Sequence, residues 1–301
     1  MKGILLKSMQ RLALTLAGLG LAAAAVLPTT AAAATPAPLL GCGLSAGALA
    51  DGWSGGYDIT TTKPPQVRVR DSYPMFNSTA SATWYYTEEA GGRSSYSGLI
   101  LQGSNMYATH VAYDGVAPQP TVSATRIGTG WSTFRQLSRS NYVQGTKPHS
   151  YIYGLNTNGS LYRYTTASGI RSWGSAPGFS SLRAMTLIAE TATYDTLLAT
   201  TNGGALYTIR IPATAPMKPI VKKVRSTGYS AFESLVVQRC GTSGSVLAAF
   251  DNDANRVSIY ALSHATGEST VIKSIDTGDA GWPTPQYFLL TSARGPQLVG
   301  E

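Results

Sequence analysis

A motif of about fifty residues recurs along the chain and restricts the folds that the chain can adopt. Each copy begins with Gly, an aromatic residue and Ser, followed by apolar residues. Three clear copies begin at Gly130, Gly178 and Gly228, and weaker copies begin at Ser72 and Gly281. Such repetition indicates one supersecondary unit per copy, each burying its apolar face against the next. The aromatic residues of the five copies are Tyr73, Trp131, Phe179, Tyr229 and Trp282.

Polar turns divide each copy into short strand-like runs. Segment 156–159 stands between two such runs, and segments 202–204 and 251–253 take the corresponding places in the next copies. Asn and Gly tolerate the positive φ of a tight turn, so this pattern predicts β-hairpins. No periodicity long enough for a helix follows Leu27, and four short strands per repeat are typical of a propeller blade. The sequence therefore predicts an all-β fold, a five-bladed β-propeller with four-stranded antiparallel blades.

The last copy is too short to form a complete blade by itself. It starts at Trp282, and the sequence runs only to Glu301. A strand-like run over 56–59 stands before the first copy instead. We therefore expect segment 57–70 to complete the last blade beside segment 287–298. Closure of this kind removes a free sheet edge, which an open sheet would have to protect.

The start of the chain has the order of a secretory signal peptide. Lys2, Lys7 and Arg11 precede an apolar run over 12–27, and small residues follow up to Ala34. The run is shorter than the ~20 residues that span a bilayer, although a retained membrane anchor is the alternative. We expect cleavage after Ala34 and an extracellular protein without a membrane span. The expected parts are a signal peptide over 1–34, a linker with Cys42 over 35–50, and the propeller over 51–301.

Cys42 and Cys240 are the two cysteines of the chain. Outside the cytoplasm two cysteines usually pair, so we expect a disulfide between them. Completion of the last blade by the N-terminal segment would place Cys42 beside the copy that contains Cys240. The alternative is lipidation of Cys42, because segment 39–42 resembles a lipoprotein attachment box, but a proline-bounded segment over 28–38 separates it from the apolar run.

The charge and the histidines exclude several classes of function. Charged residues make up 13% of the chain and its formal net charge is +8, which is too modest to predict a nucleic-acid partner for an exported protein. The histidines lie far apart without a His/Cys cluster, so no metal and no cofactor are predicted. The densest basic run is interpreted as a solvated strand face, with a patch for an anionic ligand as the alternative. This run contains Lys218, Lys222, Lys223 and Arg225.

Two segments resemble the repeat of the tachylectin family. Segment 126–137 reads RIGTGWSTFRQL, and segment 153–164 reads YGLNTNGSLYRY. That family is a five-bladed β-propeller lectin recognising N-acetylated amino sugars, so the resemblance implies this fold and glycans of the GlcNAc type as partners. The later copies depart from the pattern, with Phe179 and Tyr229 in place of Trp131. Drift of this kind can keep a scaffold while its sites are lost.

The leading functional hypothesis is non-catalytic carbohydrate binding in pockets between blades. Sugar binding needs a flat apolar face and fixed hydrogen-bonding groups, and the repeated aromatic residues are the candidates for the face. Packing in the core between sheets is the alternative role for their rings. The second hypothesis is an extracellular scaffold that binds a protein and has no sugar site. The candidate ligand-binding residues are Trp131, Trp282, Phe179, Tyr229 and Tyr73.

A glycosidase is the third hypothesis. It would need two carboxylates that face each other across the scissile bond. The acidic residues of this chain do not recur at a fixed position of the repeat, and no pair has a distinctive neighbourhood. We therefore name no catalytic residue and do not expect an enzyme.

Overall fold

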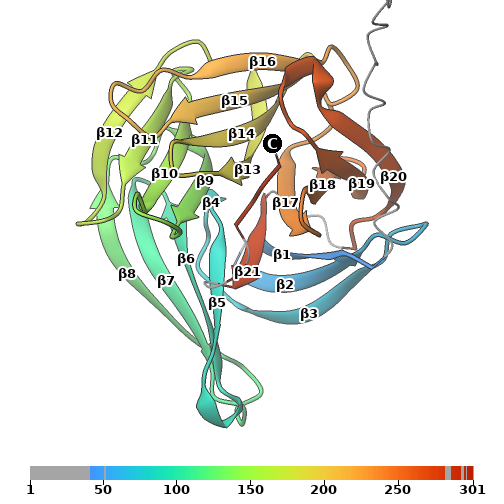
Figure 1. The fold of residues 1–301 in the computed structure, drawn as a ribbon. Helices are drawn as coiled ribbons and strands as arrows, with labels where there is room; N and C mark the ends of the chain where they lie inside the picture. Colours follow the sequence, from blue (N-terminus) through green and yellow to red (C-terminus); the bar gives the residue numbers. More distant parts are fainter. Residues whose placement is uncertain (1–40, 51, 282–285, 293–294, 296, 301) are drawn as a thin grey trace, which may run out of the picture. The chain divides into compact units, whose positions relative to one another are not determined.

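The computed structural model describes residues 41–50, 52–281, 286–292, 295 and 297–300, and these residues form an all-β fold (Figure 1). Helical structure within this part is limited to two 3₁₀ turns, η1 (Ala90–Gly92) and η2 (Gly267–Ser269). None of its helices is long and apolar enough to cross a membrane. The signal peptide expected over 1–34 and the candidate Trp282 lie outside the described residues.

Three separate sheets follow one another along the chain, and each is a four-stranded antiparallel meander. Strand order in space equals strand order in sequence, so hairpins join the neighbours as the turn pattern predicts. The first sheet has β9 (Phe134–Tyr142), β10 (His149–Asn156), β11 (Leu161–Thr165) and β12 (Arg171–Ala176). The second has β13 (Leu182–Glu190), β14 (Tyr194–Thr201), β15 (Leu206–Pro212) and β16 (Ile220–Arg225). The third has β17 (Ser234–Cys240), β18 (Gly244–Asp251), β19 (Arg256–Ser263) and β20 (Val271–Asp279).

Burial falls from the inner strands of a sheet to its outer strand. Leu197 and Leu198 point to opposite faces of β14, and both are fully buried because other sheets cover both faces. Residues 220–223 of the outer strand β16 are all exposed. The apolar core therefore lies between neighbouring sheets, and the outer strands carry the surface.

The other strands form one nine-stranded sheet that joins the two ends of the described chain (Figure 1). Its first half runs from β21 (Gln286–Ser292) through β1 (Gly43–Ala50) and β2 (Trp53–Thr60) to β3 (Val67–Pro74), all antiparallel. On its other edge β21 pairs in parallel with β5, where the second half begins. The second half contains β4 (Ala80–Ser81), β5 (Trp84–Glu88), β6 (Ser94–Gln102), β7 (Asn105–Tyr113) and β8 (Thr121–Thr129).

The pairing of β21 with β1 shows that N-terminal strands complete the sheet of the last repeat, with one correction. The strand beside β21 is β1 and not segment 57–70, so residues 43–50 are a strand where a linker was predicted. The prediction failed because the run is rich in Gly and Ala, which are poor strand formers. Gly47 is nevertheless required, because a Cβ at this position would clash with the Phe288 ring across the strand.

The innermost strands of the sheets contact one another in a closed ring. β4 contacts β9, and contacts continue through β13 and β17 to β21, which returns to β4. Residues of all five strands line one small polar cavity, among them Ser81, Gln136, Thr186, Ser234 and Gln286. Sheets arranged around a common cavity in this way form a propeller-like fold.

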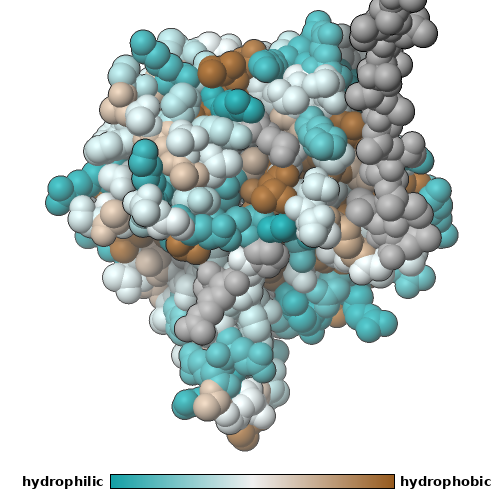
Figure 2. Space-filling model, in the orientation of Figure 1, coloured by the Kyte–Doolittle hydropathy of each residue, from teal (hydrophilic) through white to brown (hydrophobic). Residues whose placement is uncertain are grey.

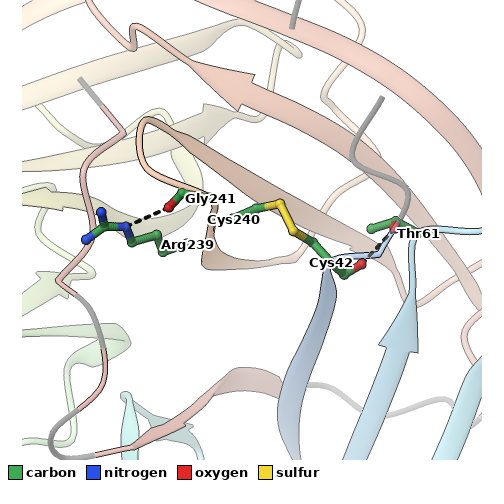
Figure 3. Close-up of a disulfide and its surroundings, with 5 residues drawn as sticks. All are labelled: Cys42, Thr61, Arg239, Cys240 and Gly241. Atoms are coloured by element: carbon green, nitrogen blue, oxygen red, sulfur yellow. Dashed lines mark hydrogen bonds between the residues drawn. A yellow bond between two sulfur atoms is a disulfide. The ribbon is translucent and has the colours of Figure 1, made fainter. Parts of the chain in front are cut away.

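A disulfide ties the start of the described chain to the third sheet (Figure 3). Cys42 precedes β1, Cys240 ends β17, and their Cα atoms are 5.9 Å apart. The Thr61 hydroxyl donates a hydrogen bond to the Cys42 carbonyl oxygen at 2.7 Å (Figure 3). The expected pairing of the two cysteines is confirmed.

One backbone hydrogen bond recurs in every repeat. Its donor is the backbone amide of a residue in the segment between two sheets. Its acceptor is a carbonyl oxygen in a hairpin turn of the preceding sheet. The bond therefore ties each sheet to the next. The donor and acceptor pairs are Met75–Gly52, Trp131–Ser104, Phe179–Gly159, Tyr229–Gly204 and Ala280–Asn255.

This hydrogen bond corrects the positions at which the weaker sequence copies were matched to the clear ones. Tyr73 lies within β3, and Met75 makes the bond that the alignment assigned to Tyr73. Ala280 makes it in the last repeat, ahead of Trp282. The alignment followed the nearest aromatic residue, whereas the bond needs only a backbone amide, which every residue except proline supplies.

Candidate functional site

The repeated aromatic rings pack in the protein interior. Trp131, Phe179 and Tyr229 expose 4%, 6% and 8% of their surface. The centre of the Trp131 ring lies 4.8 Å from that of Phe134 and 4.7 Å from that of Tyr164. This burial favours the core-packing role, and ligand binding by these residues stays a prediction.

Phe179 differs from the other two because its ring also lines a groove. The groove has a volume of about 370 Å³ and lies between the end of β12 and the strands β15 and β16. Pro177, Tyr207, Pro219 and Val221 form much of its wall. We call it the Phe179 groove.

A larger cavity, of about 590 Å³, lies between the two halves of the nine-stranded sheet. Its walls come from β1, β3 and β21 on one side and from β5, β6 and β7 on the other. We call it the Arg70 cleft. The residues that matter for its chemistry are Arg70, Asp71, Tyr86, Tyr96 and Tyr113.

A β-bulge brings two consecutive charged residues into this cleft. In the pairing of β2 with β3, Gly56 faces Asp71 and Tyr57 faces Val69, so Arg70 has no opposite residue. Neighbours in a regular strand point to opposite faces, whereas a bulge turns its extra residue. The bulge therefore lets Arg70 and Asp71 line the same cavity.

Hydrogen bonds fix the Asp71 carboxylate. Its Oδ1 atom accepts from the Gly56 amide at 2.6 Å, and its Oδ2 atom accepts from the Tyr113 hydroxyl at 2.9 Å. A Cβ on Gly56 would overlap both the Asp71 carboxylate and the Arg70 side chain, so this position needs glycine. Asp71 is thus held as an immobile acceptor in the cleft wall.

The Arg70 guanidinium is more loosely held. It lies 3.4 Å from the Asp58 carboxylate and 3.9 Å from that of Asp71, and its carbon lies 5.6 Å from the centre of the Tyr96 ring. The side chain of Arg70 is 32% exposed. A guanidinium has five N–H donors in a fixed fork, and these two distant contacts leave donors for a ligand.

Three tyrosine rings form the aromatic wall of the cleft. The Tyr96 ring centre lies 5.1 Å from that of Tyr86 and 6.1 Å from that of Tyr113. Burial raises the pKa of Tyr96 to about 12. Burial and the nearby Asp71 charge also raise the pKa of Tyr113. Both hydroxyls therefore stay neutral at physiological pH and keep their protons for hydrogen bonds.

Tyr73, a predicted ligand-binding residue, lies behind this wall. It is buried in β3, and its ring packs edge-on against Tyr113 at a centre distance of 6.5 Å. Its hydroxyl accepts a hydrogen bond from the Ser54 hydroxyl at 3.4 Å. Tyr73 therefore packs behind the tyrosine wall, on the side away from the cleft. It is not among the residues that line the cleft.

The Arg70 cleft and a smaller adjoining cavity, which share Gln238, Thr291, Ser292 and Gly295 in their walls, each have one carboxylate. Asp71 is the one carboxylate that lines the Arg70 cleft, and Glu190 is the one that lines the smaller cavity near the axis, of about 70 Å³. Burial raises the pKa of Glu190 to about 7. A glycosidase pair would need both acids in one cavity. Among the described residues no cluster of His, Cys, Asp and Glu could hold a metal ion.

Sequence reasoning missed the residues of the Arg70 cleft. They come from β3, β5, β6 and β7, and none belongs to the repeated motif. One signal was available, because the chain has 17 tyrosines and 6 phenylalanines, and tyrosine exceeds phenylalanine where an apolar wall also needs hydroxyl groups. That signal names a residue type but no position.

The sequence matches no protein-family model and no curated protein. Similar solved structures include the catalytic domain of Coprinopsis cinerea GH62 alpha-L-arabinofuranosidase, at 13% identity and a TM-score of 0.42. The match covers 73% of this chain and 74% of that chain.

Two further similar structures are lectins. The SapL1 lectin in complex with alpha methyl fucoside has 11% identity and a TM-score of 0.40, covering 79% of this chain and 82% of that chain. The Aleuria aurantia lectin in complex with Fucalpha1-6GlcNAc has 11% identity and a TM-score of 0.39, covering 80% and 82%. None of the three is named a tachylectin, so that resemblance stays a prediction.

Proposed function

We propose that this protein binds carbohydrate without catalysis and that the Arg70 cleft is its principal sugar site. The observation that carries the proposal is the arrangement of charged and aromatic groups around one open cavity. Arg70 supplies donors, Asp71 supplies a fixed acceptor, and tyrosine rings supply an apolar wall. A sugar ring has hydroxyl groups around its edge and C–H groups on its faces, so it needs this combination.

The bulge residue supports the choice of this cleft over the repeated aromatic positions. The other outer strands carry an apolar residue at the corresponding bulge, whereas β3 carries Arg70. The bulge position does not require an apolar residue for packing, because Ile127 and Trp173 are 39% and 45% exposed there, so the charge of Arg70 points to a gain of another kind. Ligand binding is the gain that we propose.

The finer features of the fold and of the compartment belong to the same proposal. We propose that the two halves of the nine-stranded sheet are separate blades, which gives five blades around the axis. Residues 1–34 act as a signal peptide, and the protein works outside the cell. The disulfide between Cys42 and Cys240 supports this compartment, because such bonds persist in oxidising surroundings.

The sugar class follows from the tachylectin resemblance, which makes N-acetylated amino sugars the first expectation. The Asp71 carboxylate, whose oxygens accept bonds from the protein, can also accept from a sugar N–H or O–H group. Fucosides are added to the test because they are present in the two lectin complexes described above.

A glycan array with the full chain, produced for export, tests the proposal. The array includes N-acetylglucosamine, chitin oligosaccharides and alpha-methyl fucoside. We expect saturable binding that free sugar competes away and that Tyr86→Ala weakens about tenfold, which is ~1.4 kcal/mol. The matched control is Tyr207→Ala, which removes a partly exposed tyrosine from the wall of the Phe179 groove.

Circular dichroism establishes that both variants are folded. A blank array from well-folded protein would overturn the proposal. Equal loss in Tyr86→Ala and Tyr207→Ala would move the site away from the Arg70 cleft.

A further inference from the structure

The outer strand β16 exposes two adjacent aliphatic side chains. Ile220 and Val221 are 50% and 49% exposed. Among the described residues, each other outer strand exposes one large hydrophobic side chain or none. Figure 2 shows hydrophobic surface at the top of the view, where Figure 1 places β16. Adjacent residues of a strand point to opposite faces, so both faces of β16 carry an exposed aliphatic group.

The Phe179 groove lies directly beside this strand. Val221 pairs with Ile209 and Lys223 pairs with Tyr207, so these four side chains share the face of the sheet that lines the groove. The groove is therefore an apolar slot that a lysine borders. Its volume of about 370 Å³ is sufficient for one or two side chains of a partner.

Positive charge lies on both faces of β16 beside the groove, with no carboxylate paired to it among the described residues. Lys218, Lys222 and Lys223 are exposed, and none forms an ion pair with a carboxylate among the described residues. Lys222 donates instead to the Thr266 hydroxyl at 3.4 Å. A complementary partner is acidic. A second copy of this chain would bring lysines of one β16 against those of the other, which disfavours self-pairing.

The backbone of β16 is also available for pairing. β16 pairs with β15 on one side, and within the described part of the chain no strand pairs with its other side. An open edge can accept an extended peptide as an additional strand, with alternate side chains entering neighbouring pockets. Lysines on an edge also discourage uncontrolled pairing, which selects against any partner except an acidic one.

We propose that the Phe179 groove and the edge of β16 bind an extended acidic segment of a partner polypeptide. The segment adds to the sheet as a strand, places apolar side chains on the groove face beside Val221, and sets acidic side chains on the opposite face, where Lys222 lies. This site is separate from the Arg70 cleft, so the protein would hold a glycan and a polypeptide at the same time.

Fluorescence anisotropy with a labelled synthetic peptide tests the proposal. The probe is a peptide of about ten residues that alternates valine with glutamate, and a peptide that alternates valine with lysine is the control. We expect saturable binding of the acidic peptide by the full chain. Hydrogen exchange should show new protection of the β16 amides in the complex, because strand addition gives these amides new acceptors.

Two variants and two controls separate the proposed mode from general charge attraction. Lys222→Glu and Val221→Ser should each weaken peptide binding about tenfold, the first by repulsion of the glutamates on its face of the strand and the second by loss of the apolar contact. Lys273→Glu is the matched control, because Lys273 is an exposed lysine on β20, another outer strand. It should leave the affinity unchanged, as should Tyr86→Ala in the Arg70 cleft.

Two results would overturn the proposal. One is the absence of saturable binding of the acidic peptide at low salt. The other is binding that Lys273→Glu weakens as much as Lys222→Glu, or that Val221→Ser does not affect, since either would mean attraction of any polyanion. A failed glycan array with successful peptide binding would remove the sugar site alone.

Discussion

The outer strands of this molecule contain the same backbone irregularity and use it differently. β3, β8, β12, β16 and β20 each have one β-bulge in the pairing with the preceding strand. In four of them the extra residue is apolar, namely Ile127, Trp173, Val224 and Ile275. In β3 it is Arg70, beside the largest of the cavities described above. A position that is apolar in the other outer strands, where Ile127 and Trp173 are themselves 39% and 45% exposed, thus carries a charged group beside the Arg70 cleft.

The difference teaches where a repeat protein can diverge. The three regular sheets keep an aromatic residue in the core at each junction, whereas Met75 takes that place before β4. The two halves of the nine-stranded sheet are joined by only three parallel residue pairs between β21 and β5. The irregular junction therefore leaves space that the regular junctions fill with side chains.

Loss of the disulfide should have the largest effect on this comparison. Cys42→Ser removes a bond between residues separated by 198 positions. We expect the free energy of unfolding to fall by about 5 kcal/mol, because the unfolded chain regains loop entropy. Urea denaturation of Cys42→Ser and Cys240→Ser checks this, and reduced wild-type protein should match both. A variant as stable as the oxidised wild type would contradict the expectation.

Removal of a core aromatic residue should destabilise the three regular sheets without changing the Arg70 cleft. Trp131→Ala should lower the free energy of unfolding by about 4 kcal/mol, because it empties a packed position among Phe134 and Tyr164. Glycan affinity of the folded fraction should stay unchanged. Denaturation and glycan titration of the same sample measure both quantities. Loss of affinity in folded Trp131→Ala would return this residue to the binding site.

A buried acid on the regular side offers a comparison by pH. The folded state favours the protonated form of Glu190, so its stabilising effect is present below about pH 4.5 and is lost as pH rises through about 7. The loss amounts to about 3 kcal/mol at most. Glu190→Gln keeps an acceptor for the Asn141 amide and should remove this pH dependence. Urea denaturation at pH 5 and pH 8 measures it, and an unchanged pH slope would contradict the prediction.

Replacement of the bulge residue of β3 by an apolar residue tests the comparison most directly. The expected free-energy change is the smallest of the four predictions. Arg70→Ile gives this bulge the type of residue found in the other outer strands. Glycan affinity should fall by about 2 kcal/mol, because a charged donor is removed from the cleft. Stability should change by less than about 1 kcal/mol, since the ion pairs of Arg70 are partly exposed. Lys223→Ile, beside the bulge of β16, is the matched control, and equal loss in both would refute the assignment.

Much of the fold was accessible from the sequence because hairpin turns and strand periodicity are local. The polar turns at 156–159 and 202–204 join β10 to β11 and β14 to β15 as predicted. The disulfide followed from the number of cysteines and their surroundings. The strand β1 was missed because its Gly and Ala side chains suit a close approach of Phe288 that only the tertiary structure reveals.

The candidate site was less accessible because it depends on register. A β-bulge shifts Arg70 relative to Gly56, and no residue pattern in the sequence announces that shift. Asp71 and Tyr113 are brought together from β3 and β7, which are far apart in the sequence. The repeated aromatic residues were predicted to bind a ligand because they recur in the sequence. They recur because the junctions between the regular sheets need the same packing.

The pairing of β1 with β21 also sets the order in which the molecule can be assembled. The three regular sheets contain only hairpins between consecutive strands, and such local contacts form early in folding. In the nine-stranded sheet the pairing of β1 with β21 joins opposite ends of the described chain, so it is a contact of the largest sequence separation. The Arg70 cleft takes one wall from each half, so it needs the pairing of β21 with both β1 and β5. The proposed ligand binding would therefore report that the two ends of the described chain are paired, and a chain without that pairing would not display it.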